Sequence, residues 1–131
     1  MTEAPARPDN GIVEKAITFF YYVDLPRAFD FYTGVMGFPL EIDQGWSKIL
    51  RIAEHAYVGL VDETRGMHRA NPIKPVQLCI RVPDVDAWHR YLSSQNAIGL
   101  TEPKDSVSLG IRAFVLEDPE GYQIEVQSAL R

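Results

Sequence analysis

The sequence predicts an α+β domain built from two tandem βαβββ modules, and an internal repeat is the first reason. Tyr22-Val23-Asp24-Leu25 recurs in the second half of the chain as Val82-Pro83-Asp84-Val85. Each copy lies between a strand-like run and a segment in which apolar residues have helical spacing. Short strand-like runs separated by turn residues then follow both helical segments. Two copies of one small unit can pack as a pseudo-symmetric pair with a ligand groove between them.

The composition indicates one domain. The chain has 131 residues, of which 46% are apolar and 24% charged, and this length can bury a core without disulfides. We expect a flexible arm at residues 1–12 and a single folded domain at residues 13–131. Within that domain, module 1 covers about 13–62, a linker rich in proline and mixed charge covers 63–75, and module 2 covers about 76–131.

Charge limits the expected partners, and cysteine content limits the expected disulfides. The net charge is -5 and no Lys/Arg cluster is present, so neither a nucleic acid nor a membrane is an expected partner. No apolar run approaches the roughly 20 residues that cross a bilayer. Cys79 is the only cysteine, which excludes an intrachain disulfide and fits a cytoplasmic protein.

Module 1 is predicted to begin with a buried strand at residues 17–22, where aromatic and β-branched residues dominate. Asp24 is placed as the N-cap of a helix, because its carboxylate can accept from the free N–H groups of the first turn. Gly37 is the expected end of that helix. Three further strands are predicted at residues 39–42, 46–52 and 57–61.

Module 2 repeats this order, with a strand at residues 76–82, a helix capped by Asp84 that ends before Gly99, and a tight turn at residues 118–121. Its remaining strands are predicted at residues 100–101, 111–116 and 122–127. Apolar and polar residues alternate along its first and last strands, so one face packs on the helices and the other faces a polar groove. The groove face is expected to carry Gln77, Cys79, Arg81, Gln123, Glu125 and Gln127.

Two strings in the chain carry a family resemblance. The first is YVDLPRAFDFYTGVMGF at residues 22–38, and the second is FVLEDPEGYQIEV at residues 114–126. They resemble the first and last motifs of the vicinal oxygen chelate superfamily, which includes glyoxalase I, extradiol dioxygenases and bleomycin-resistance proteins. The resemblance implies modules whose sheets curl into one mixed sheet with an open groove, helices on the outer face, and a homodimer. One such scaffold serves many chemistries.

The resemblance also implies four metal positions, one on each of four strands. In this chain they are Ile17, Gly59, Gln77 and Glu125, and only Gln77 and Glu125 carry a donor atom. A firmly bound divalent ion usually needs three or more protein donors. We therefore expect no cofactor, although a metal that takes further donors from elsewhere stays open. His55, His68 and His89 fall in a turn, the linker and a helix, and are interpreted as ordinary solvated or capping residues.

Glu125 is the candidate catalytic residue, as a general base or a substrate anchor near Gln77. An inherited carboxylate that pairs with Arg81, Lys48 or water is an equally weighted interpretation. The candidate ligand-binding residues are Phe19, Tyr21, Lys48, Tyr57, Gln77 and Arg81. The aromatic members of this set would stack on a planar ligand, and the cations would reach an anionic group.

Three functional hypotheses remain open at this point. The favoured one is a metal-independent protein that binds, or transforms through Glu125, a small aromatic or apolar metabolite. The second is a metal-dependent lyase, isomerase or dioxygenase. The third is a non-catalytic dimeric binding or regulatory module whose groove is filled by its own aromatic residues.

Overall fold

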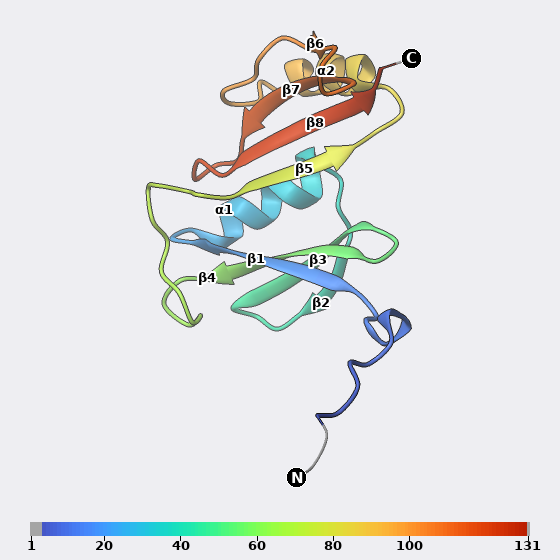
Figure 1. Ribbon diagram of the computed structural model, residues 1–131. Helices are drawn as coiled ribbons and strands as arrows, with labels where there is room; N and C mark the ends of the chain where they lie inside the picture. Colours follow the sequence, from blue (N-terminus) through green and yellow to red (C-terminus); the bar gives the residue numbers. More distant parts are fainter. Residues whose placement is uncertain (1–3, 131) are drawn as a thin grey trace.

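The computed structural model describes residues 4–130 and consists of two four-stranded mixed sheets, each covered by a helical segment (Figure 1). The first sheet has the order β1-β4-β3-β2, in which β1 and β4 are parallel and the other pairs antiparallel. Its strands are β1 (Ala16–Tyr22), β2 (Leu40–Asp43), β3 (Ser47–Ala53) and β4 (Ala56–Asp62).

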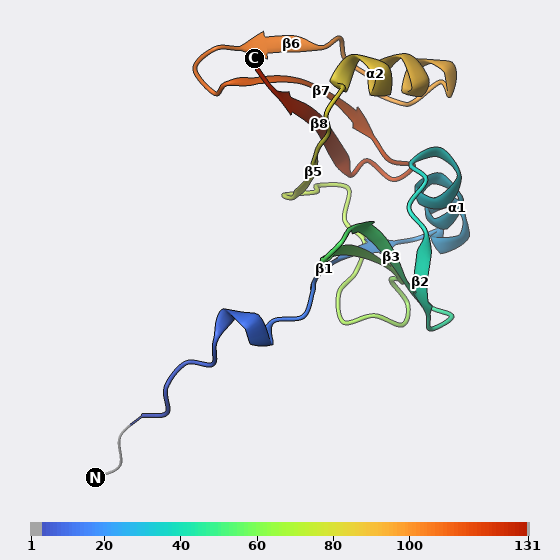
Figure 2. The same cartoon turned by 90° about the vertical axis from the view of Figure 1, so that its right-hand side faces the viewer.

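The second sheet repeats the topology as β5-β8-β7-β6, again with the first and last strands of the module parallel. Its strands are β5 (Gln77–Arg81), β6 (Lys104–Ser106), β7 (Ile111–Glu117) and β8 (Gln123–Ala129). Together the sheets confirm the predicted fold class of tandem βαβββ modules, and the two sheets do not close into a barrel. The edge strands β1 and β5 are those nearest the other module (Figures 1 and 2).

Both helices begin at the predicted aspartates. Asp24 Oδ1 accepts from the backbone N–H of Arg27 at the start of α1 (Leu25–Asp30), and Asp84 Oδ1 accepts from that of Ala87 at the start of α2 (Val85–Ser94). The two helices cover the same side of the sheets (Figure 2). That side is the outer face predicted from the sequence.

Most strand boundaries lie within two residues of those predicted, and two elements differ in kind. The α-helix of module 1 ends early and continues as a π-helical turn, η2 (Phe31–Val35), in which the N–H of Met36 bonds to the carbonyl of Phe31. The prediction of a strand at residues 100–101 is wrong, since no strand forms there. There, Thr101 Oγ1 takes the place of a backbone acceptor for Val115 N–H, and the β6 ladder forms only after Pro103.

A single hydrophobic core extends through both modules. Its largest fully buried side chains include Phe20, Tyr22 and Leu60 from module 1 and Phe114, Leu116 and Ile124 from module 2. The rings of Phe20 and Tyr122 stack across the seam, with centroids 4.3 Å apart. The modules are therefore two halves of one packed body.

A buried polar cluster also joins the halves. Asp118 is only 1% exposed, and its Oδ2 accepts from the hydroxyls of Tyr22 at 2.5 Å and Tyr32 at 2.9 Å. Its Oδ1 accepts from the backbone N–H groups of Glu120 and Tyr122, both at 2.9 Å. The turn at residues 118–121 thus presents a carboxyl group to the first module, so the motif that carries the resemblance serves structure here.

Glu120 completes this connection from the same turn. Its two carboxylate oxygens accept from the backbone N–H groups of Val23 and Asp24, at 2.9 and 2.8 Å, just before α1. Tyr122 Oη bonds to both the N–H and the carbonyl of Tyr21 on β1. The free edge of β1 is therefore held by side chains of module 2.

The N-terminal arm extends away from the packed body (Figures 1 and 2). Among the described residues before β1, the one element is a short 3₁₀ turn, η1 (Asn10–Ile12), and Ile12 and Val13 are 66% and 73% exposed. No helix within residues 4–130 combines the length and the apolar character that a membrane crossing demands.

Candidate functional site

The inner faces of the two sheets, opposite the helices, carry different side chains. On the first sheet, Phe19 of β1 lies beside Gly59 of β4 in the ladder. A Cβ added to Gly59 would overlap the Phe19 ring, with its Cε1 only 2.5 Å away. A side chain at position 59 would have to displace the aromatic ring, which occupies the space that it would fill.

Beside this contact lies a cavity of about 200 Å³, which we call the aromatic pocket. Phe19 and Tyr21 line it from β1, and the guanidinium of Arg65 lies over the Trp46 ring, 5.9 Å from its centroid. His68 packs edge-on against Tyr21, with ring centroids 5.2 Å apart. The lining includes Phe19, Tyr21, Gln44, Trp46, Ser47 and Arg65.

The inner face of the second sheet is a ladder of polar pairs between β5 and β8, which we call the polar ladder. Gln77 Nε2 donates to Gln123 Oε1 at 2.5 Å, and Arg81 Nε donates to Gln127 Oε1 at 2.9 Å. Between them, Cys79 Sγ donates to Glu125 Oε2 at 3.3 Å. These side chains bond mainly to one another.

Glu125 is well supplied with donors, since Gln127 Nε2 also reaches its Oε2, at 2.6 Å. Burial, followed by the hydrogen bond and charge of Glu125, raises the pKa of the Cys79 thiol to about 11. The thiol is therefore protonated at neutral pH and is a poor nucleophile. Of the alternatives left open for Glu125, an ion pair with Arg81 or Lys48 does not form within residues 4–130, and Cys79 and Gln127 both donate to its Oε2.

Glu125 also lines a second cavity of about 330 Å³, beside β6 and β7. Its other lining residues include Thr101, Glu102, Lys104, Asp105 and Val115. No residue lines both this cavity and the aromatic pocket. The structure thus separates the candidate catalytic carboxylate from the aromatic side chains with which it was expected to share a groove.

The four positions that the resemblance assigns to a metal do not fit a divalent ion. Ile17 has no donor, and the space above Gly59 is filled by the Phe19 ring. Gln77 and Glu125 are engaged in the polar ladder. Within residues 4–130, no group of three or more His, Cys, Asp or Glu side chains is placed to hold a metal.

The remaining predicted residues lie apart from the aromatic pocket. Lys48 pairs across β3 and β4 with Leu60, on the helix-covered face, where its Nζ contacts Asp43 at 2.8 Å and lies over the Phe29 ring. The register of β3 thus turns this candidate away from the inner face. Tyr57 is on the inner face but 7% exposed, and Lys15 lies over its ring.

Sequence reasoning missed part of the pocket lining. Gln44, Arg65 and Met67 line the pocket from a turn and from the linker, where no periodicity reports which way a side chain points. Trp46 beside a turn and three cationic residues in the linker were the only signals available. Residues 65–67 pack back against the sheet. The alternation of side chains along a strand cannot predict the path of such a linker segment.

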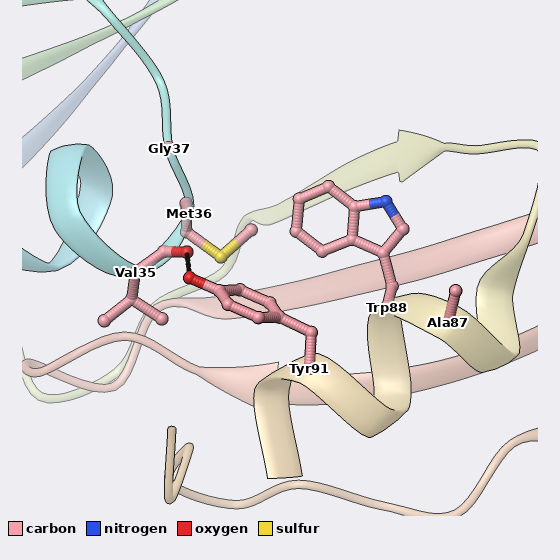
Figure 3. A pocket seen from close by; sticks show the side chains of 6 residues that line it. All are labelled: Val35, Met36, Gly37, Ala87, Trp88 and Tyr91. Atoms are coloured by element: carbon pink, nitrogen blue, oxygen red, sulfur yellow. Dashed lines mark hydrogen bonds between the residues drawn. The ribbon is translucent and has the colours of Figure 1, made fainter. Parts of the chain in front are cut away.

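A third cavity, of about 370 Å³, lies on the helix side at the seam between modules (Figure 3). Tyr91 Oη on α2 donates to the carbonyl of Val35 at 2.7 Å, and Met36 and Trp88 face the same space. Its lining contains no charged side chain and none of the predicted site residues. Its lining is mainly apolar, with the Tyr91 hydroxyl and the Trp88 indole N–H as its side-chain polar groups.

Comparison with known proteins agrees with this architecture. The model of the Glyoxalase/Bleomycin resistance protein/Dioxygenase superfamily matches residues 16–126. The chain belongs to this superfamily. No curated protein is significantly similar to it in sequence.

Solved structures of superfamily type share the fold at low identity. Lactoylglutathione lyase from Agrobacterium tumefaciens is 20% identical with a TM-score of 0.71, over 93% of this chain and 96% of that one. TioX from Micromonospora sp. ML1 is 21% identical with a TM-score of 0.72, over 88% and 98%. A glyoxalase/bleomycin resistance protein/dioxygenase from Nocardioides is 17% identical with a TM-score of 0.74, over 98% and 87%. At these identities the likeness concerns the fold alone.

Proposed function

We propose that this superfamily member binds a small aromatic molecule in the aromatic pocket and sequesters it without a metal ion. The observation that carries the proposal is the Phe19 ring seated on Gly59. It replaces a metal-ligand position with an aromatic surface, at the wall of a cavity that also contains Trp46 and Tyr21. Aromatic rings stack favourably on such surfaces, and each good contact stabilises a complex by about 1 kcal/mol beyond area burial.

Sequestration is preferred to catalysis because the pocket contains no acid or base in position. Glu125 lines a different cavity and its carboxylate already accepts two hydrogen bonds from the polar ladder. A general base must lie within hydrogen-bond reach of the proton that it removes. Lyase, isomerase and dioxygenase activity therefore have less support in this chain than binding.

We further propose that the protein acts as a homodimer in which a second copy covers the open inner faces. Phe19 and Trp46 are 42% and 39% exposed, although they line the pocket. Closure by a second copy would shield both from water. Light scattering after size exclusion tests this point, and a monomer at micromolar concentration would contradict it.

The binding proposal is tested by titrating the protein with single-ring aromatic compounds and following tryptophan fluorescence and heat. We expect Trp46→Leu to weaken binding by about ten-fold, since it removes a stacking surface. Trp88→Leu is the matched control, because it removes the other tryptophan from the helix-side cavity. Glu125→Gln should leave affinity unchanged.

Two results would contradict this function. One is a Glu125→Gln variant that loses as much affinity as Trp46→Leu, which would place the ligand on the polar ladder. The other is a near-stoichiometric content of Zn, Mn, Fe or Ni in protein purified without chelator. Elemental analysis measures that content directly and would restore the metal-dependent interpretation.

A further inference from the structure

We propose that the ligand of the aromatic pocket is a single-ring aromatic carboxylate whose anionic group binds Arg65; this inference rests on the proposed function. Size gives the first argument. The pocket measures about 200 Å³, and an apolar protein cavity of about 150 Å³ is known to hold benzene. One ring with a small substituent therefore matches the size of the pocket.

The charge of the lining gives the second argument. Arg65 is the only ionised residue among those that line the pocket, and no carboxylate faces it from the lining. Within residues 4–130, Arg65 forms no salt bridge. Asp62 is the nearby acid: its Oδ1 accepts from the N–H and hydroxyl of Thr64 at 2.9 and 2.7 Å, and these bonds, with a smaller contribution from the charge of Arg65, lower the pKa of Asp62. The guanidinium donors are thus available to a ligand.

Arg65 is an exposed residue at the rim of the aromatic pocket. Its guanidinium lies over the Trp46 ring, which holds the flat donor group at the pocket wall through a cation–π contact. Arginine in this arrangement can bind a carboxylate through two parallel N–H donors. Trp46 and Arg65 therefore offer, side by side, an aromatic surface for the ligand ring and two N–H donors for the ligand carboxylate.

Ser47 offers a further polar contact at the same cavity. The residue is 2% exposed and lines the pocket, and its hydroxyl forms no hydrogen bond within the described part of the chain. A ligand carboxylate is an acceptor for that hydroxyl. A neutral aromatic molecule would use only the rings, and an aliphatic acid only the polar groups. The combination selects a molecule that has both.

The test compares benzoate with benzyl alcohol, which has one ring and no charge, by NMR titration of the full-length protein at pH 7. We expect benzoate to bind about ten-fold more tightly, because a charge-assisted hydrogen bond adds to stacking. Arg65→Gln should weaken benzoate by about ten-fold and leave benzyl alcohol unchanged. Arg90→Gln, which removes the same charge from exposed α2, should change neither.

The outcomes separate this inference from the function on which it rests. If both compounds shift the resonances of Phe19 and Trp46 with equal affinity, aromatic binding holds and the carboxylate inference is overturned. Equal losses in Arg65→Gln and Arg90→Gln would also overturn it, because net charge alone would then govern binding. If neither compound binds at millimolar concentration, the proposed function fails together with the inference.

Discussion

The inner faces of the two sheets occupy the same place in the repeat and have opposite chemistry. In module 1, Phe19 and Gly59 stand side by side across the parallel pair of strands, and an aromatic ring covers a glycine. In module 2, the equivalent pair is Cys79 and Glu125, and a thiol donates to a carboxylate. The backbone of the repeat is thus kept while its side chains are free to change.

The two inner faces differ in how readily they can accept a ligand. The side chains of the polar ladder already bond to one another, so a ligand there would compete with existing hydrogen bonds. The aromatic face has few polar groups to satisfy and borders an open cavity. Apolar surface of this kind favours binding because water leaves it readily.

The buried Asp118 cluster joins the two modules into one folding unit. Asp118→Ala tests this connection and has the largest expected effect. The change leaves the buried hydroxyls of Tyr22 and Tyr32 without their acceptor. We expect a loss of about 3–5 kcal/mol in the free energy of unfolding, measured in urea. Asp30→Asn, at an exposed position, is the control. A loss below 1 kcal/mol would mean that the seam contributes little.

High pH acts on the same seam. Burial first, and then nearby charges, raise the pKa of the Tyr22 and Tyr32 hydroxyls well above 10.0. Stability is therefore fully present below pH 10 and falls above it, because the unfolded chain releases protons that the folded chain retains. Between pH 10 and 11 an unfolded tyrosine is only partly ionised, so two such groups together lower the free energy of unfolding by about 2 kcal/mol over that range. Tyr32→Phe should reduce that loss by about 1 kcal/mol in denaturant titrations at pH 10–11.

Equivalent substitutions at positions 59 and 125 test the contrast between the faces themselves. Gly59→Ala forces a Cβ into the Phe19 ring and should destabilise by about 1–3 kcal/mol. Glu125→Gln preserves shape on the polar ladder and should cost less than about 1 kcal/mol. The pair Gly59→Ala with Phe19→Ala should recover part of the loss. Equal losses in the free energy of unfolding at positions 59 and 125 would show that the two faces are packed alike.

The smallest expected effect concerns Cys79. With a pKa of about 11, against an ordinary 9.0, its thiolate fraction at pH 7.5 is about 100-fold below that of an unperturbed thiol. Alkylation by iodoacetamide should be correspondingly slow. Glu125→Gln removes one of the two main causes, so the rate should rise, while burial keeps it below that of a free thiol. A rate unchanged by the variant would mean that Glu125 does not bear on the thiol.

Much of the fold was predictable because its signals are local. Asp24 and Asp84 cap their helices through hydrogen bonds within three residues, and such contacts need no tertiary information. Alternation along β5 and β8 correctly placed Gln77, Cys79 and Glu125 on one face. The strand at residues 100–101 was mispredicted because Pro103 and the side chain of Thr101 shift the ladder, an effect that depends on β7.

The sequence by itself determined the two modules, their capped helices, the family and the absence of donors at Ile17 and Gly59. These follow from residue identity and short-range periodicity. Only the tertiary structure decided that Phe19 covers Gly59, that Lys48 faces the helices, and that Glu125 and the aromatic side chains line separate cavities. The tertiary structure also places the Arg65 guanidinium over the Trp46 ring. The physical reason is that strand register and the path of a linker are set by packing between distant segments, and a local pattern carries no record of it.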